Sequence, residues 1–269
     1  MTFSTIMVYV DVEAFDNSSL GVAVDLAEKF DAKLIGISAA SLAWTYYAEG
    51  LPRELLEQLN ADVAKRLADT EQRFRCAVTK RVRRLEWRSA ITAPESYVPH
   101  QSRAADLVVV GRNRDGLIRS PLDVGDLVMR AGRPILVVPP TVDKVALKSA
   151  VVAWKDTREA RRAVNDALPL LKKMKDVIVV EMIDDESDRG AAHARLTDVI
   201  AWFGTHGISA LSRVFRFAES RDPMERLWEY GADFIVAGAY GHTQTREWVF
   251  GGFTRDLLRR CPHCALLSH

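Results

Sequence analysis

The feature that most limits the possible folds is a segment that occurs twice in the chain. The sequence ADFIVAGAYGHTQTREWVFGGFTRDLL spans residues 232–258, and ADLVVVGRNRDGLIRSPLDVGDLVMR, which begins at Ala105, aligns with it. Further pairs agree: IMVYVD, which ends at Asp11, matches AVVAWK, which ends at Lys155, and PILVV matches the terminal HCALL. One duplication therefore accounts for all 269 residues, and each half is large enough to bury its own core.

Both halves alternate short apolar runs with amphipathic stretches, which is the pattern of a doubly wound α/β sheet. Runs rich in Val, Ile and Leu predict buried parallel strands, and they lie at 6–10, 34–39, 84–88, 107–110 and 135–138, then at 150–154, 177–182, 212–217, 233–237 and 264–267. Helical patterns lie between them at 18–30, 52–79, a short one after Pro94, and 122–130, then at 158–173, 188–205, 221–229 and 251–260.

We therefore expect two tandem domains, residues 1–140 and 149–269, each a five-stranded parallel sheet with helices on both faces. Residues 139–148 hold two prolines and little periodicity, which predicts the linker. In the long helix of the first half, apolar residues recur at helical spacing and are predicted to pack on the sheet. These residues are Leu55, Leu59, Val63, Leu67 and Phe74.

Bulk composition excludes several classes of protein. The charge is nearly balanced, with 37 basic against 36 acidic residues, so nucleic acid is not an expected partner. Apolar runs stay well below the roughly 18 residues of a membrane span, and the start of the chain lacks a basic region followed by a cleavage site. Three cysteines, an odd number, argue against a disulfide framework. We expect a soluble, cytoplasmic protein without a membrane partner.

Ligands of doubly wound sheets bind outside the carboxyl ends of the strands, and this rule selects candidate residues. Glycine lets the backbone approach a ligand closely, and a helix start offers unpaired N–H groups to an anion. A guanidinium near the loop can pair with phosphate by two hydrogen bonds. In the second half the candidates are Trp154, Lys155 and Asp156 after the first strand, Met182 and Ile183 after the second, and Gly238, Gly241, His242, Arg246, Gly251, Gly252, Phe253 and Thr254 around the fourth.

The two halves resemble tandem universal stress protein domains over essentially the whole chain. In that family a glycine, two residues, a second glycine, nine residues, and then glycine with Ser or Thr are associated with binding the phosphates of ATP. The second half matches at Gly238, Gly241 and Gly251 and departs at Gly252, although Thr254 is nearby. The resemblance implies adenine near Met182 or Ile183, ribose near residues 153–156, from Ala153 to Asp156, and phosphates on the glycine segment, with or without Mg.

The first half departs further from this pattern. It keeps Asp11 where nucleotide-binding members commonly carry an acidic residue, whereas the second half has Lys155 there. It places Arg114 at the second glycine, and Leu122 and Asp123 at the glycine and hydroxyl pair. A bulky Arg and an anionic Asp should block the backbone and repel phosphate. We predict that the first half does not bind nucleotide through its loop, and that Lys155 pairs with phosphate or with Asp156.

Three functions remain open from the sequence. The first is a stress-response protein that binds an adenine nucleotide in the second half and acts as a regulatory or signalling module. The second is a structural or interaction protein that has lost its ligand. The third is a redox or zinc protein that uses Cys261 and Cys264, with His263 and His269 nearby. Catalysis is not indicated, because the sequence holds no P-loop and no nucleophile with an evident base, so any ATP hydrolysis should be slow.

The resemblance also implies how the halves meet. Universal stress protein domains often dimerise along the last strand of the fold, so two copies on one chain are expected to make that dimer internally. The joining edges would be PILVVP and HCALLSH, which would cover otherwise exposed backbone. A further dimer of chains and the identity of a protein partner stay open.

Overall fold

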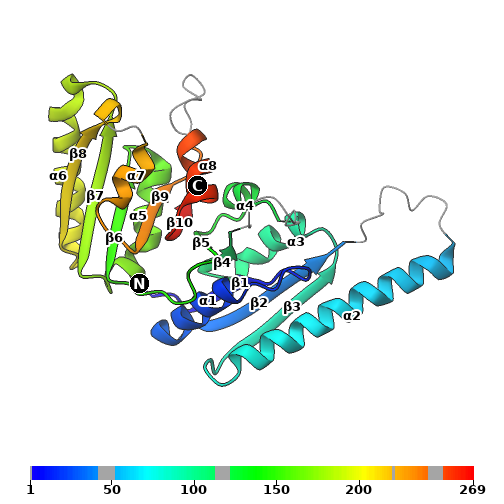
Figure 1. The fold of residues 1–269 in the computed structure, drawn as a ribbon. Coiled ribbons are helices and arrows are strands. Elements are labelled where there is room, and N and C mark those ends of the chain that lie inside the picture. Colours follow the sequence, from blue (N-terminus) through cyan, green and yellow to red (C-terminus); the bar gives the residue numbers. More distant parts are fainter. Residues whose placement is uncertain (1, 42–51, 113–121, 220–221, 242–250) are drawn as a thin grey trace.

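The computed structural model of the chain describes residues 2–41, 52–112, 122–219, 222–241 and 251–269. Ten strands form one sheet in the order β3-β2-β1-β4-β5-β10-β9-β6-β7-β8 (Figure 1). The strands are β1 (Thr5–Tyr9), β2 (Lys33–Ala40), β3 (Leu85–Ile91), β4 (Leu107–Gly111), β5 (Ile135–Val138), β6 (Ser149–Trp154), β7 (Asp176–Ile183), β8 (Ala210–Arg216), β9 (Phe234–Gly238) and β10 (Cys264–Ser268). Each matches a predicted apolar run to within a few residues.

The helices also follow the predicted order. They are α1 (Asn17–Phe30), α2 (Arg53–Val78), α3 (Pro94–Gln101), α4 (Val124–Arg130), α5 (Arg158–Leu171), α6 (Arg189–Thr205), α7 (Pro223–Trp228) and α8 (Gly251–Arg260). Strands within each half are parallel to their neighbours, so the doubly wound α/β class predicted from the sequence is confirmed.

The two halves join through their last strands. β5 and β10 pair antiparallel, with Leu136 opposite Leu266 and Ile135 opposite Leu267, as the resemblance implied. All four side chains are fully buried. Burying an aliphatic side chain of this size stabilises the fold by about 1.5–3 kcal/mol. The seam is thus both a hydrogen-bonded ladder and part of the core, and it leaves β3 and β8 as the sheet edges.

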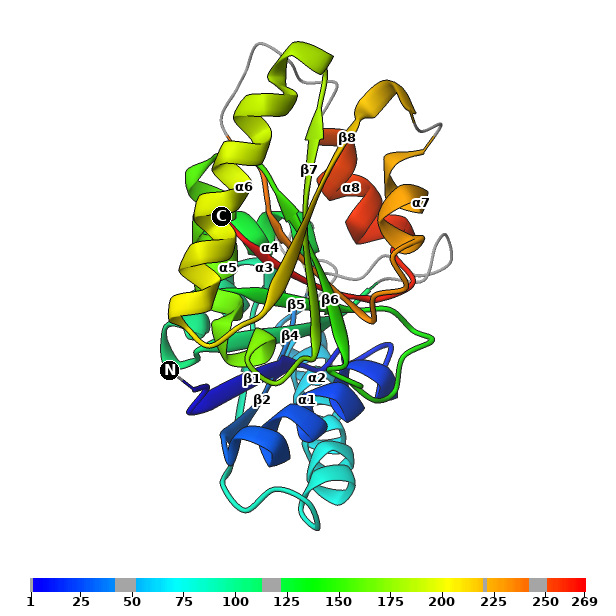
Figure 2. The same cartoon turned by 90° about the vertical axis from the view of Figure 1, so that its left-hand side faces the viewer.

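Helices cover both faces of the sheet, and each face has its own core. One face carries α1, α2, α5 and α6, whose apolar residues pack with β-strand residues of both halves in a single cluster. The other face carries α3, α4, α7 and α8. Figure 2 shows this layering in the second half, with α5 and α6 on one side of the strands and α7 and α8 on the other. The first core cluster runs across the seam without a break, through Leu136 and Leu266.

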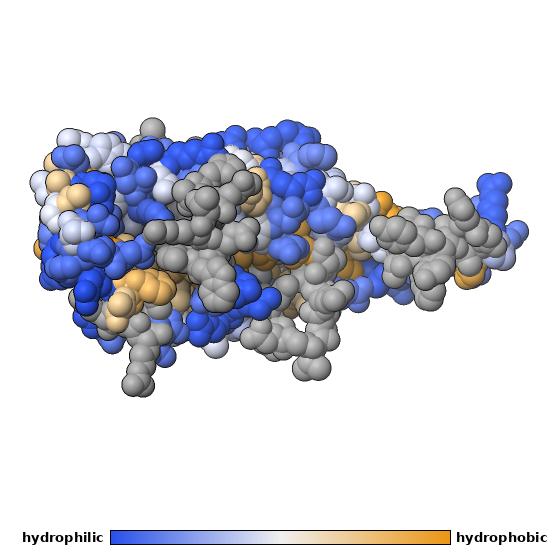
Figure 3. Space-filling view, turned by 90° about the horizontal axis from the view of Figure 1, so that it is seen from above, coloured by the Kyte–Doolittle hydropathy of each residue, from blue (hydrophilic) through white to orange (hydrophobic). Residues whose placement is uncertain are grey.

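The long helix α2 runs beyond the sheet, which corrects one prediction. Val63, Leu67 and Phe74 are buried as expected, but Leu55 is 39% exposed. The first turns of α2 stand away from the strands (Figure 1), and the space-filling view shows this end as a narrow, mostly hydrophilic projection (Figure 3). Helical spacing therefore predicts the face of α2 correctly but not the point at which the sheet stops beneath it.

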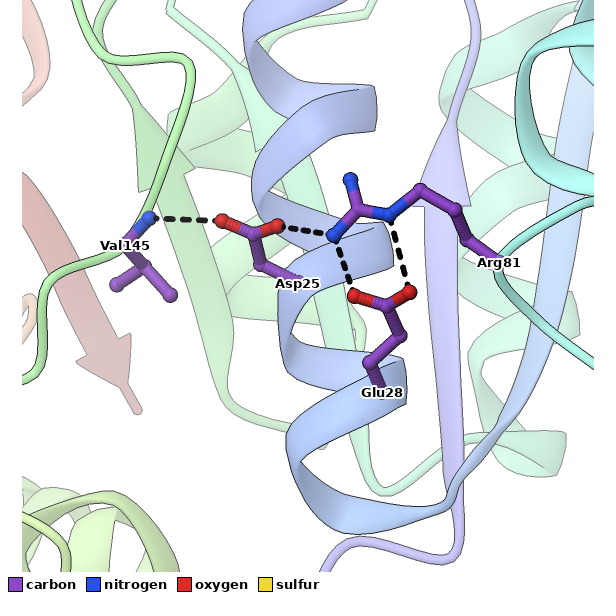
Figure 4. Close-up of polar contacts among 4 residues, drawn as sticks. All are labelled: Asp25, Glu28, Arg81 and Val145. Atoms are coloured by element: carbon purple, nitrogen blue, oxygen red, sulfur yellow. Dashed lines mark hydrogen bonds and ion pairs between the residues drawn. The ribbon is translucent and has the colours of Figure 1, made fainter.

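The linker is held against the first half by a polar network. Residues 139–148 contain no helix or strand, as predicted. The Val145 N–H donates to Asp25 Oδ2 at 3.3 Å, and Arg81 donates to Asp25 at 2.7 Å and to Glu28 at 3.0 Å (Figure 4). These bonds raise the pKa of the Arg81 guanidinium, chiefly through the hydrogen bond to Glu28 and then that to Asp25. One carboxylate on α1 thus binds both the linker and the turn that follows α2.

Side chains also cross between the halves near the seam. Arg112, at the end of β4, donates to the Cys261 carbonyl just after α8. Tyr240 follows β9 and reaches α4, where its hydroxyl would lie 2.5 Å from a methyl group placed on Gly125. Tyr240 adopts φ +55°, a left-handed conformation that costs a non-glycine residue about 1 kcal/mol or more. The loop after β9 is therefore in contact with the other half. Among the described residues, no helix is long and apolar enough to cross a lipid bilayer.

We predict that Gly125 and Tyr240 are energetically coupled. Gly125→Ala should destabilise the chain by about 1 kcal/mol, because the tyrosine must shift to admit the methyl group. In a Tyr240→Ala background the same change should cost much less, giving a coupling of about 0.5–1 kcal/mol in a double-mutant cycle. Urea denaturation of the four proteins measures it. Equal costs in the two backgrounds would contradict the contact.

Candidate functional site

The first glycine of the candidate loop is required by packing. β9 ends at Gly238 against the start of α5, and a methyl group there would lie 2.5 Å from Ala160 N and 2.6 Å from the Glu159 carbonyl carbon. Both neighbours are backbone atoms, so they cannot turn aside. The equivalent Gly111 in the first half also lies close to the start of the first helix, but there a methyl group would meet the side-chain carboxylate of Asp16, which caps α1. The repeated glycine therefore reflects close helix–strand packing in both halves, whether or not a ligand approaches it.

A buried carboxylate lies beside the second glycine. Glu159, in the first turn of α5, is only 2% exposed, and a methyl group on Gly241 would lie 3.0 Å from its Oε2. Burial raises the pKa of Glu159, but hydrogen bonds from Arg158, from its own backbone N–H and from Thr157 outweigh burial and leave the pKa below its ordinary value. Glu159 is therefore ionised at neutral pH. No sequence pattern marks Glu159, because only the folded backbone brings the start of α5 beside Gly241.

Three of the predicted residues come together as an apolar surface. Ala153, Met182 and Phe253 are half-buried and pack on one cluster, from β6, β7 and α8 respectively. Buried Val180 and Leu227 lie beneath them in the same cluster. This surface lies on the face of the sheet that carries α7 and α8. Partly exposed apolar side chains of this kind suit contact with an aromatic ring.

The other predicted residues on and just after β6 and β7 do not belong to this apolar surface. Trp154 is 8% exposed and belongs to the core cluster on the opposite face, with α5 and α6. Ile183 is buried, at 4% exposed. Asp156 pairs with Arg161 at 2.6 Å on the surface, where the sequence analysis considered Lys155 as its partner. Because neighbouring strand residues point to opposite faces, this candidate stretch cannot converge as a whole on one ligand.

The helix that follows the loop begins where predicted. α8 starts at Gly251, and Thr254, one turn inside it, is 2% exposed. Gly251 and Gly252 thus form the helix start, where backbone N–H groups lack intrahelical partners. His242 and Arg246 lie outside the described residues, so their predicted contacts with an anion stay predictions.

The equivalent crevice of the first half is filled. Tyr9 stands two residues before Asp11, as Ala153 stands two residues before Lys155, and its ring is 6% exposed. Burial raises the pKa of the Tyr9 phenol well above its ordinary value, with further contributions from Asp11 and Glu95. A large buried ring in the first half therefore occupies the position of a small, half-buried alanine in the second half.

The helix start of the first half already holds an anion of its own. Asp123 caps α4, and its Oδ1 accepts hydrogen bonds from the N–H groups of Gly125 at 2.7 Å and Asp126 at 3.1 Å. Asp11 likewise accepts from the Glu13 N–H at 2.8 Å in a local turn. The donors that would bind phosphate are satisfied internally. Residues 113–121 of this loop lie outside the described residues, so its expected failure to bind nucleotide stays a prediction.

The two C-terminal cysteines are buried and protonated. Cys261 and Cys264 are each 1% exposed, and burial raises the pKa of Cys261 to about 11 and that of Cys264 to about 12. Cys261 Sγ donates to the His263 carbonyl at 3.3 Å. Within the part of the chain that the structure describes, no group of three or more His, Cys, Asp or Glu residues is arranged to hold a metal ion. Thiols in this state are poor nucleophiles, because the thiolate is the reactive form.

An adenine nucleotide fits this site in part. The apolar surface of Ala153, Met182 and Phe253 includes a residue from the first turn of α8, the helix that follows the glycine segment. The buried, ionised Glu159 next to Gly241 opposes an uncompensated phosphate. Arg158 pairs with this carboxylate, and the predicted cations His242 and Arg246 lie outside the described residues.

Comparisons with known proteins identify the fold. No protein-family model matches the chain, and no curated protein sequence matches it. The structure of a universal stress protein from Archaeoglobus fulgidus DSM 4304 is similar, with a TM-score of 0.70 and 15% identity over 97% of this chain and 95% of that chain. A functionally unknown protein from Pseudomonas aeruginosa PAO1 has a TM-score of 0.58 and 13% identity over 99% of this chain and 92% of that chain. The fold is therefore that of tandem universal stress protein domains.

The packing role of Gly238 gives a testable prediction. Gly238→Ala should destabilise the chain by about 2 kcal/mol or more, because the methyl group meets fixed backbone. Gly204→Ala is the matched control, since Gly204 lies in α6 with nothing within 4 Å, and it should be neutral or stabilising by up to about 1 kcal/mol. Denaturant midpoints of both variants and the parent measure this. Equal midpoints for the two variants would refute the packing role.

Alkylation tests the state of the thiols. At pH 7.5 iodoacetamide should label Cys76, which is exposed, and should label Cys261 and Cys264 only after denaturation. Raising the pH to 9 should change little, because both pKa values stay well above it. Peptide mass spectrometry reads the labelled positions. Rapid labelling of Cys264 in the folded chain would revive the redox alternative.

Proposed function

We propose that this chain is a stress-response protein of the universal stress protein type, in which the second half binds an adenine nucleotide such as ATP. The observation that carries the proposal is the half-buried apolar surface of Ala153, Met182 and Phe253 beside a glycine loop and a helix start. The filled first half supports it by contrast. There the buried Tyr9 ring stands where the second half has the small Ala153, and Asp123 accepts hydrogen bonds from the start of α4.

The nucleotide acts as a regulatory signal in this proposal. Tyr240 belongs to the loop that would receive phosphate and contacts α4 of the other half. Nucleotide bound at the loop would therefore alter the contact between Tyr240 and α4 across the seam, and a protein partner could recognise that change. The free cysteines suit the reducing cytoplasm, and the balanced charge suits a partner other than nucleic acid.

A second candidate is an interaction protein that has lost its ligand. Glu159 favours it, because a buried carboxylate next to Gly241 repels phosphate. Mass spectrometry of small molecules released from denatured, freshly purified protein separates the two. Stoichiometric adenine nucleotide supports the first candidate, and none after purification at low salt supports the second.

Ligand-induced thermal shifts test the loop directly. At an ATP concentration about 100 times Kd, the parent should gain about 2.7 kcal/mol, which raises Tm by several degrees. Gly241→Asp should abolish this shift, because it adds a second carboxylate beside Glu159. Gly204→Asp adds the same charge in open space on α6 and should keep the shift. The proposal fails if Gly241→Asp and the parent respond equally to ATP.

A further inference from the structure

The basic residues of the chain are unevenly distributed, and many of them lie where four segments meet. These segments are 25–33, 79–84, 143–148 and 172–176, and they lead into β2, β3, β6 and β7. Together they carry eleven basic against five acidic residues, a net charge of +6 in a chain whose net charge is +1. The rest of the chain is therefore net acidic, and the balanced total conceals a local surplus of positive charge.

Contacts join these segments into one continuous surface. The Arg81 guanidinium, in the turn after α2, donates to Asp25 of α1 at 2.7 Å. The Val145 N–H of the linker donates to the other oxygen of the same carboxylate at 3.3 Å (Figure 4). Asp25 therefore lies at the point where three of the four segments meet.

The fourth segment, the turn after α5, is attached to the other three. The N–H groups of Lys175 and Asp176 donate to the Lys148 carbonyl of the linker, at 2.9 Å and 3.2 Å. Lys173 Nζ lies 4.9 Å from the centre of the Phe30 ring, at the end of α1. Lysines of the second half thus lie directly beside α1 of the first half. We call the four segments together the basic surface.

Most cations of the basic surface are available to an external anion. Three of the eleven, Lys33, Arg81 and Arg84, pair with acidic residues of the same region. The other eight are exposed, and none of them has an ion-pair partner within the part of the chain that the structure describes. Like charges at this density repel one another, so the cluster destabilises the fold unless an anion compensates it. The basic surface therefore favours an anionic partner.

The composition of the basic surface indicates which kind of anion it fits. Seven of the eight cations are lysines, whereas arginine is the residue that suits bidentate recognition of phosphate in nucleic acids. Peripheral membrane binding needs buried apolar area as well as positive charge. The large hydrophobic side chains that are exposed among the described residues all lie outside the four segments: Leu55, Ile91, Met129, Leu211 and Phe217. Exposed lysines without apolar neighbours suit the carboxylates of a protein.

We propose that the basic surface binds an acidic segment of a partner protein, rich in Asp and Glu. The surface lies at the amino ends of β6 and β7, whereas Ala153 and Met182 lie near the carboxyl ends of the same strands. A partner on the basic surface therefore leaves the candidate nucleotide site uncovered. The proposal does not rest on nucleotide binding, and either can fail without the other.

Fluorescence anisotropy of a labelled Glu-rich peptide, titrated with the full chain, tests the proposal. The parent should bind this peptide and should not bind a Gln-rich peptide of equal length. Affinity should fall several-fold between about 50 and about 200 mM NaCl, because salt screens exposed charges. Equal binding of the two peptides, or no binding of the Glu-rich peptide at low salt, would overturn the proposal.

Charge reversal locates the binding surface. The triple variant Lys80→Glu, Lys172→Glu and Lys175→Glu should weaken binding of the Glu-rich peptide at least about tenfold, and it leaves Lys173 in place over Phe30. The matched control makes the same change of net charge at exposed positions outside the basic surface: Lys65→Glu, Arg213→Glu and Arg259→Glu. The control should bind nearly as tightly as the parent. Equal losses in the two variants would show that net charge alone attracts the peptide, and would overturn the assignment.

Competing ligands test the choice of a protein partner. A DNA duplex and vesicles of phosphatidylserine with phosphatidylcholine should each bind the parent more weakly than the Glu-rich peptide does at the same salt concentration. Tighter binding of the duplex or of the vesicles would overturn the protein partner in favour of that ligand. Circular dichroism establishes that the variants are folded, and the comparisons made on the parent decide the matter if they are not.

Discussion

The antiparallel pairing of β5 with β10 is the constraint on which the rest of the molecule depends. Each half ends in the strand that would otherwise be an exposed edge, and each covers the other. Because the cores on both faces continue across this seam, the halves are not separable bodies joined by residues 139–148. The seam also brings the loop after β9 close to α4, so that Tyr240 of one half fills space beside Gly125 of the other.

On this common frame the two halves have diverged by changes in side-chain volume and charge. Tyr9 is a buried ring at the position where the second half has the half-buried Ala153, and Asp123 caps the start of α4, the counterpart of α8, which begins at Gly251. An acid at the start of the first helix in each half lies against a glycine, although not the equivalent one: Asp16 against Gly111, the last residue of β4, and Glu159 against Gly241, three residues after β9 ends. Asp16 is used as a helix cap, whereas Glu159 is not, because Thr157 already performs that role.

The sequence predicted the order and bounds of the strands and helices well, because apolar periodicity and strand length are local properties. It predicted α8 from Gly251 and the pairing of PILVVP with HCALLSH, the latter through the family resemblance. It could not show that Trp154 and Met182 lie on opposite faces of the sheet. Which residues of a strand face which side depends on the register of that strand in the sheet. Nor could it reveal Glu159 beneath Gly241 or the exposure of Leu55, which depend on packing between distant segments.

Because β5 pairs with β10, the sheet formed by the described residues has two edge strands, β3 and β8, and both carry charged side chains. Arg88 on β3 is paired with Glu86, and β8 carries Arg213 and Arg216 beside its exposed Leu211. Guanidinium groups on a terminal strand repel the same strand of another molecule and must be desolvated before any β-strand can be added. Both edges of the sheet thus carry charged side chains that disfavour pairing with a strand of another molecule.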